Sequence, residues 1–195
     1  MLFAIEIALD AFTSGPFVPK IVPKTPALET VLSVIFVILG DYRYFVLVES
    51  FAKRRAPAND ALFGSARAWL AALPFALVVP VASQIVRELA PSLFAEMRKT
   101  FLLYEVMFLA LALAMRFVVA PRRLRDAPSD VRAWLLRLTS FEVVQYALWA
   151  LADVVILTGH AEPGFLLRLA PNVAYYGGFL FFAWLTATRR LRQRD

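Results

Sequence analysis

Long apolar stretches alternate with short polar ones along this chain. A helix needs about 20 mostly apolar residues to cross the hydrocarbon of a bilayer, and five stretches meet this requirement. They are residues 27–50, 64–88, 100–120, 134–158 and 164–188. The pattern predicts an all-α fold, a polytopic membrane bundle of about five transmembrane helices over residues 27–188, followed by a basic tail over residues 189–195.

Proline interrupts two of these stretches. The second contains Pro74 and Pro80, and the fifth contains Pro171. Proline breaks a soluble helix because it removes a backbone donor and clashes with the preceding turn. In a membrane bundle, neighbouring helices can satisfy the carbonyls that proline leaves free. We therefore expect kinked spans here, with the carbonyl of Leu167 freed by Pro171.

The first 26 residues differ from the rest. Residues 1–12 are apolar but short, carry Glu6 and Asp10, and lead into a proline-rich stretch at 16–26. An amphipathic segment of this kind lies in the membrane interface, and proline-rich linkers are stiff. We expect residues 1–26 to form a short interfacial helix at the outer surface and a connector; a sixth span is the alternative.

Composition places most of the chain in lipid. Of 195 residues, 61% are hydrophobic and 18% are charged, with a mean hydropathy of +0.66, whereas soluble domains have about 45–50% apolar and about 25% charged residues. Cysteine is absent and His160 is the one histidine. Disulfides, thiolate metal sites and histidine clusters are thereby excluded, so we expect no metal and no cofactor.

Basic residues mark the orientation. Lys and Arg gather in alternate connections, at 53–67, 122–137 and 189–194, while the other connections, which hold Arg98 and Arg168, are poorer. The positive-inside bias then predicts an outside N-terminus and a cytoplasmic C-terminus in a bacterial inner membrane. The net charge of +6 fits anionic lipid as a partner. Nucleic acid is not expected, because interleaved aromatics and a soluble fold are missing.

Polar groups of the fourth stretch share one side of its helix. At about 100° per residue, Glu142, Gln145, Tyr146 and Asp153 fall within one stripe. Ionisable residues inside a membrane face a bundle interior or a water-filled cavity. We expect protein or water to cover this stripe. No basic residue of the same face accompanies the two acids, which predicts compensation by a cation, a proton or a partner.

The fifth stretch offers a matching face in Asn172, Tyr175 and Tyr176. The short connection between the fourth and fifth stretches makes them antiparallel neighbours, so we expect the two polar faces to meet. Both faces would then form one seam inside the bundle.

Other acids and one base lie within the first and third stretches. Asp41 and Arg43 are two residues apart on a helix and therefore cannot pair with each other. For Arg43 we expect Glu142 or Glu105 as the partner. Glu105 and Asp153 are candidate proton-exchanging groups. The structural alternative is that buried ion pairs merely hold the helices together, and we favour it for Asp41 and Arg43.

These features predict a small transporter or channel that passes a cation, a proton or a small solute. Its transport or binding seam would comprise Asp41, Arg43, Glu105, Glu142, Gln145, Tyr146, Asp153, Asn172, Tyr175 and Tyr176. Five helices barely enclose a cavity, so we expect a homo-oligomer or an assembly with another membrane protein.

Two alternatives are open. One is a non-transporting accessory or scaffold subunit of a membrane complex. The other is a membrane-embedded, lipid-modifying enzyme that uses carboxylates. No serine elbow, phosphate loop or histidine cluster supports an enzyme, and we expect no catalytic residues.

Overall fold

A computed structural model describes Ile5, residues 26–52 and residues 66–187. The predicted interfacial helix and connector, apart from Ile5 and Pro26, lie outside the described residues. So does the predicted basic tail at 189–195.

The described part of the chain is helical and contains no strand. Its long helices are α2 (Pro26–Ala52), α3 (Ala66–Leu89), α4 (Met97–Ala114), α6 (Ser129–Leu157) and α7 (Ala161–Val173). A π-helical turn, η1 (Met115–Val119), and the short α5 (Ala120–Arg123) continue α4; a second π turn, η2 (Ala174–Gly178), and α8 (Phe179–Thr186) continue α7. The result is five helical rods in the described residues, each matching one predicted stretch.

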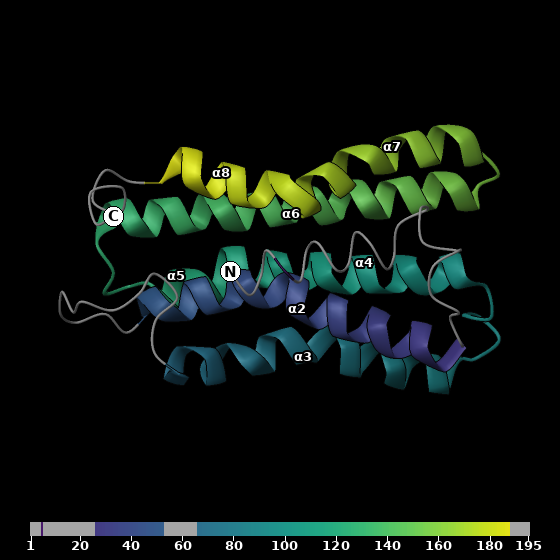
Figure 1. Ribbon diagram of the computed structural model, residues 1–195, viewed down its shortest axis with the longest axis horizontal. Helices are drawn as coiled ribbons and strands as arrows, with labels where there is room; N and C mark the ends of the chain where they lie inside the picture. The colour runs from purple at the N-terminus through teal and green to yellow at the C-terminus, as the bar shows by residue number, and fades with distance from the viewer. Residues whose placement is uncertain (1–4, 6–25, 53–65, 188–195) are drawn as a thin grey trace.

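The five rods lie alongside one another, as Figure 1 shows. The central rod is α6, which packs against both α4 and α7, while α2 packs on α3 and α3 on α4. Only a short connection separates α6 from α7, and they are antiparallel neighbours as predicted (Figure 1). The start of α2 and the end of α8 lie at opposite ends of the bundle (Figure 1).

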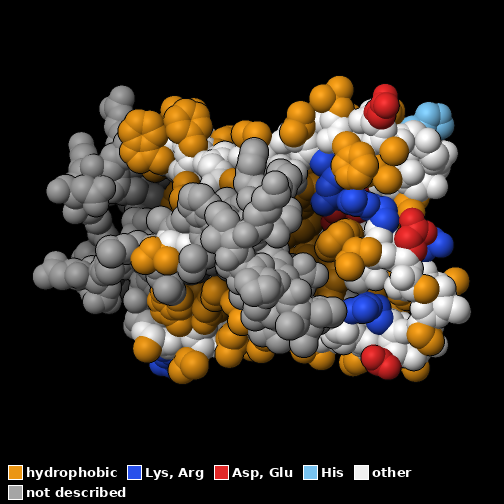
Figure 2. Space-filling view, turned by 45° about the vertical axis from the view of Figure 1, so that its right-hand side comes forward, with side chains coloured by type: hydrophobic (Ala, Val, Ile, Leu, Met, Phe, Trp, Pro, Cys, Tyr) orange, Lys and Arg blue, Asp and Glu red, His pale blue; other side chains and the backbone are white. Residues whose placement is uncertain are grey.

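Three of the described helices are long and apolar enough to cross a membrane. They are Ala66–Leu89, Met97–Arg123 and Ser129–Leu157. Large apolar side chains cover their outer surfaces; Leu70 on α3, for example, is 70% exposed. On the face seen in Figure 2, apolar side chains cover much of the described surface and charged side chains gather towards one end. A surface this apolar is costly in water, so we treat the chain as a membrane protein with transmembrane helices.

Proline and π turns shape two of the rods. Pro74 and Pro80 both lie inside α3 without ending it, as predicted for a membrane helix. Pro171 lies in the last turn of α7, and η2 begins three residues later. The π turns were not predicted. Each inserts an extra residue into the helical repeat, so the faces of α7 and α8 do not follow a single 100° progression.

Apolar packing fills the bundle in two clusters of buried side chains. One cluster joins the second half of α2 to α6 and α8, with Val46, Leu135, Leu138 and Phe179 buried. A smaller cluster joins Val79, Phe108 and Tyr146. Tyr146 of the smaller cluster also bonds Asp41, one of the buried polar side chains in the middle of α2 and α6.

Candidate functional site

The polar stripe of α6 is buried along its length. Glu142, Gln145, Tyr146 and Asp153 expose 4%, 2%, 6% and 0% of their surface. The prediction that protein or water covers this face is therefore confirmed, since the side chains are buried within the bundle. The stripe residues take part in two groups together with side chains of neighbouring helices. We call the first the central cluster (Asp41, Arg43, Glu142, Gln145 and Tyr146) and the second the ionic cluster (Arg98, Glu105, Asp153 and Arg168).

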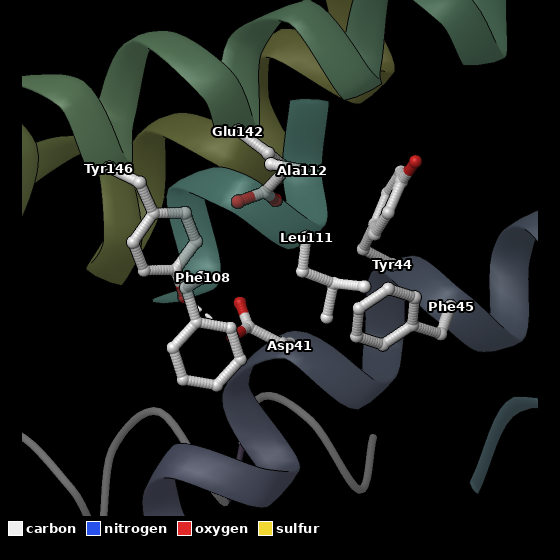
Figure 3. A pocket seen from close by; sticks show the side chains of 8 residues that line it. All are labelled: Asp41, Tyr44, Phe45, Phe108, Leu111, Ala112, Glu142 and Tyr146. Carbon is white, nitrogen blue, oxygen red and sulfur yellow. Dashed lines mark hydrogen bonds between the residues drawn. The ribbon is translucent and has the colours of Figure 1, made fainter. Parts of the chain in front are cut away.

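In the central cluster, acids from two helices face the same small void. The hydroxyl of Tyr146 donates a hydrogen bond to Asp41 Oδ2 at 2.5 Å. The carboxyl groups of Asp41 on α2 and Glu142 on α6 point towards each other (Figure 3). The void between them measures about 10 Å³, which is roughly the room that one water molecule needs.

Aromatic and aliphatic side chains line most of this void. Its apolar walls are formed by Phe45 on α2 and by Phe108, Leu111 and Ala112 on α4, with the ring of Tyr44 beside them. The low-dielectric walls strengthen every electrostatic interaction within. The two carboxyl groups therefore influence each other strongly.

Arg43 lies beside these acids but bonds elsewhere. Its Nη2 donates to the backbone carbonyl of Tyr175 at 2.9 Å, and its guanidinium lies 5.1 Å and 5.0 Å from the ring centroids of Tyr175 and Phe179. In the described part of the chain no ion pair joins Arg43 to Glu142, and Glu105 pairs with Arg168 instead. The predicted partners of Arg43 were therefore wrong.

The position of η2 explains why Arg43 bonds a backbone carbonyl and not a carboxylate. This π turn interrupts the regular helical hydrogen-bond ladder and lies against α2, where Tyr175 approaches Gly40 closely. The carbonyl of Tyr175 is thus the acceptor that the Arg43 side chain reaches. Nothing in the residue pattern of α2 signals this contact.

Several polar atoms of the central cluster have no hydrogen-bond partner among the described residues. They are Arg43 Nε and Nη1, Glu142 Oε2 and both amide atoms of Gln145. A buried polar group without a partner costs about 1–3 kcal/mol. Unsatisfied buried groups are few in native proteins and mark sites of bound water or ions. Their concentration in the central cluster, where Glu142 also lines the void, identifies the candidate site.

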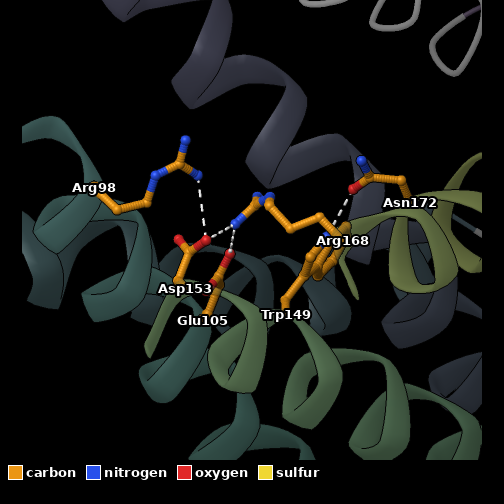
Figure 4. A network of polar contacts seen from close by, with 6 residues as sticks. All are labelled: Arg98, Glu105, Trp149, Asp153, Arg168 and Asn172. Carbon is orange, nitrogen blue, oxygen red and sulfur yellow. Dashed lines mark hydrogen bonds and ion pairs between the residues drawn. The ribbon is translucent and has the colours of Figure 1, made fainter. Parts of the chain in front are cut away.

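The ionic cluster compensates the second acid of the stripe (Figure 4). Asp153 Oδ1 accepts from Arg98 at 3.2 Å and also from Arg168. Arg168 bonds Glu105 Oε1 at 3.0 Å as well. Compensation by a cation, a proton or a partner was predicted for both acids of α6, and for Asp153 this was wrong, because Arg98 of α4 and Arg168 of α7 supply the positive charge from within the chain.

Sequence reasoning missed these two arginines because it counted them with the connections. Two signals were present. Arg98 and Glu105 are seven residues apart, which puts them on one face of α4, and Arg168 is four residues before Asn172. Each arginine thus shares a helix face with a predicted seam residue.

Trp149 joins the central cluster to the polar face of α7. Its Nε1 donates to Asn172 Oδ1 at 2.8 Å (Figure 4), and its ring lies 5.5 Å from the rings of both Tyr146 and Tyr175. The predicted meeting of the α6 and α7 polar faces is therefore confirmed through Asn172. Tyr176 is half-buried and packs edge-on against Tyr175.

Towards the opposite end of α6, further polar pairs continue from the central cluster. Tyr44 and Thr139 share a hydrogen bond of 2.7 Å between their hydroxyl groups. Arg116 Nε donates to Ser140 Oγ at 2.8 Å. At the end of α2, Glu49 pairs with Arg123 at 3.0 Å. Polar groups thus follow α6 from Asp153 to Thr139.

Metal-binding geometry is not found among the described residues, where no three acidic or histidine side chains gather suitably. Fold and site together define a helical membrane protein with buried charged groups.

The chain matches no model of a known protein family, no curated protein and no solved structure.

Proposed function

We propose that this protein is a small transporter or channel of the bacterial inner membrane, passing a proton, a cation or a small solute. One observation carries the proposal: buried polar side chains from α2, α4 and α6, joined by the partly exposed Arg168 of α7, form a file along α6. From Thr139 to Asp153 the file extends about 20 Å at 1.5 Å per residue, against a hydrocarbon core of about 30 Å. Polar groups are expensive at this depth and mark ion or solute pathways.

Two features favour transport over the alternatives. An accessory subunit would hold its acids ready for a partner's basic residues, whereas Asp153 and Glu105 already meet Arg168 within the chain. A lipid-modifying enzyme needs space for a lipid beside its acids, whereas the void between Asp41 and Glu142 has room for about one water.

The proposal includes the topology. All five rods would cross the bilayer, with the N-terminus outside, the C-terminus in the cytoplasm and anionic lipid near the basic connections. The site would lie within each chain, and copies of the chain, or another membrane protein, would pack on its apolar outer faces.

Thiol labelling tests this topology cleanly, because the chain has no cysteine. We expect a membrane-impermeant maleimide to label His160→Cys, between α6 and α7, in intact spheroplasts. Asp126→Cys, between α5 and α6, should react only after permeabilisation. Both positions are exposed, so reactivity of Asp126→Cys from outside would reverse the orientation, and equal reactivity of both from outside would contradict a crossing by α6.

Flux through proteoliposomes tests the function. We expect Glu142→Gln to lower the rate of proton or cation flux at least tenfold, because the variant cannot carry the charge that compensates a moving cation; tenfold corresponds to about 1.4 kcal/mol in the barrier. The measurement is the initial rate with a dye trapped inside the vesicles at a fixed membrane potential.

The matched control for this variant is Glu88→Gln. It makes the same chemical change at an exposed position near the end of α3 and should leave the rate unchanged. Wild-type vesicles that pass nothing above empty liposomes would refute the transport proposal and turn attention to the accessory-subunit alternative.

A further inference from the structure

The size of the central void limits what can occupy it. At about 10 Å³ it has room for roughly one water. A metal cation needs far more, since Ca²⁺ takes 6–8 oxygen ligands and Mg²⁺ keeps an octahedral shell of them. K⁺ channels replace the hydration shell with whole rings of carbonyl oxygens. Around this void the side-chain oxygens come from Asp41, Glu142 and Tyr146, because the hydroxyl of Tyr44 points away from the two carboxyl groups (Figure 3) and bonds Thr139.

The charges around the void set a second, independent limit on the species that can bind there. The titratable and charged groups around the void are Asp41, Arg43 and Tyr44 on α2, Arg116 on η1, Glu142 and Tyr146 on α6, and Tyr175 on η2, while α4 lines it with apolar side chains. Of the two arginines, Arg43 is the one whose charge acts on both carboxylates. Arg116 bonds Ser140 and lies over the Phe117 ring, and neither contact involves Asp41 or Glu142.

Arg43 is always charged, so it compensates one of the two facing carboxylates. With both acids ionised, this group of three carries one uncompensated negative charge in a low-dielectric interior, which is unfavourable. One added proton makes the group neutral. A metal cation would also supply a positive charge, but it would need the space and the ligands that the void lacks.

The positions of the two carboxyl groups suit a shared proton. Asp41 and Glu142 project from different helices into one space (Figure 3), and Asp41 is oriented by the Tyr146 hydroxyl. Glu142 Oε2 is unpartnered among the described residues and is 96% buried, so it has an oxygen free to accept a proton.

Resting on the proposed function, we infer that the species bound by the central cluster is a proton, held by Asp41 and Glu142 together and passed between them. In this step the O–H bond of one carboxyl breaks and an O–H bond forms on the other carboxylate. Through a single water, that water gives one of its own protons to the acceptor and receives one from the donor. The net charge of the three groups is the same before and after.

The experiment combines infrared spectroscopy with flux, using the full chain. In nanodiscs at neutral pH, we expect the wild-type protein to show the C=O stretch of a buried, protonated carboxylic acid that resists exchange with bulk solvent. Both Glu142→Gln and Asp41→Asn should lose or displace this band, and Glu88→Gln should keep it. Tyr146→Phe retains both acids and removes only the hydrogen bond to Asp41, so the band should persist at a shifted frequency.

In proteoliposomes with a trapped pH indicator, we expect proton flux that is unchanged when choline replaces Na⁺ and K⁺. Glu142→Gln should lower it at least tenfold. Tyr146→Phe, which preserves the charges, keeps the test decisive if either acid variant fails to fold.

Failure of the bound-proton inference and failure of the transport proposal give different results in these two measurements. Flux that requires Na⁺ or K⁺, or a wild-type spectrum without a protonated carboxyl band, would overturn the inference and leave transport standing. A protonated band present in wild type and lost in Glu142→Gln, with no flux of any ion, would support the bound proton and overturn the proposed function.

Discussion

Replacing Arg168 by Met is expected to lower the free energy of unfolding by about 3–5 kcal/mol, the range found when one partner of a buried ion pair is removed. Arg168 bonds both Glu105 and Asp153, and its side chain is 19% exposed while that of Asp153 is fully buried. Without it, Arg98 alone faces two carboxylates. The measurement is denaturant or thermal unfolding in a fixed detergent or bicelle composition.

A second substitution shows whether the loss is electrostatic. Adding Glu105→Gln to Arg168→Met leaves Arg98 paired with Asp153 and removes the excess negative charge. We expect the double variant to recover at least about 1 kcal/mol, the scale of one hydrogen bond or relieved charge. The coupling energy from the complete double-mutant cycle measures this term.

The matched control is Lys99→Met, one residue after Arg98. Lys99 pairs with Glu96 at 3.4 Å, with both side chains at least half exposed, and exposed pairs contribute about 0–1 kcal/mol. If Arg168→Met costs no more than Lys99→Met, or if Glu105→Gln adds a further loss to it, the ionic cluster does not stabilise the bundle as described.

Replacing Gly40 by Ala is expected to destabilise the protein by about 1–3 kcal/mol or more, the cost of inserting a methyl group into a packed core. A Cβ at Gly40 would overlap the ring of Tyr175. That ring has little freedom to move, because Arg43 holds the Tyr175 carbonyl and the ring of Trp149 lies tilted beside it, with the ring centroids 5.5 Å apart. The substitution should therefore separate α2 from η2 and weaken the Arg43 hydrogen bond.

Gly177→Ala is the matched control, within η2 itself. A Cβ there meets nothing within 4 Å, and alanine is favoured over glycine in a helix by about 0.5–1 kcal/mol. We expect this variant to unfold at the same temperature as wild type or a higher one. Equal stability of the two alanine variants would contradict the close packing of α2 on η2.

Much of the fold and part of the site could be predicted from local patterns. The five rods follow from runs of apolar residues matched to the thickness of a bilayer. Burial of Glu142, Gln145, Tyr146 and Asp153 follows from their common face on α6. Each prediction needs only the geometry of one helix, and a helix is the structure that satisfies every backbone polar group within lipid.

Pairing could not be predicted in the same way. Arg98 and Arg168 are 55 and 15 residues from Asp153, and Arg43 is 132 residues from the carbonyl it binds. Helix periodicity assigns a residue to a face but does not say which helix covers that face. The π turns η1 and η2 made the pairing still harder to predict, because the residue inserted at each turn rotates the faces of the helix that follows.

The sequence by itself thus determined an all-helical membrane protein whose fourth apolar helix hides its acids from lipid, because hydrophobicity and the helical repeat act locally. Tertiary structure decided how each acid is compensated. It gave Asp153 two arginines from neighbouring helices and left Asp41 and Glu142 facing one void with Arg43 beside them. Side chains distant along the chain acquire a common environment only when the helices pack, and the charge balance of a buried site depends on that environment.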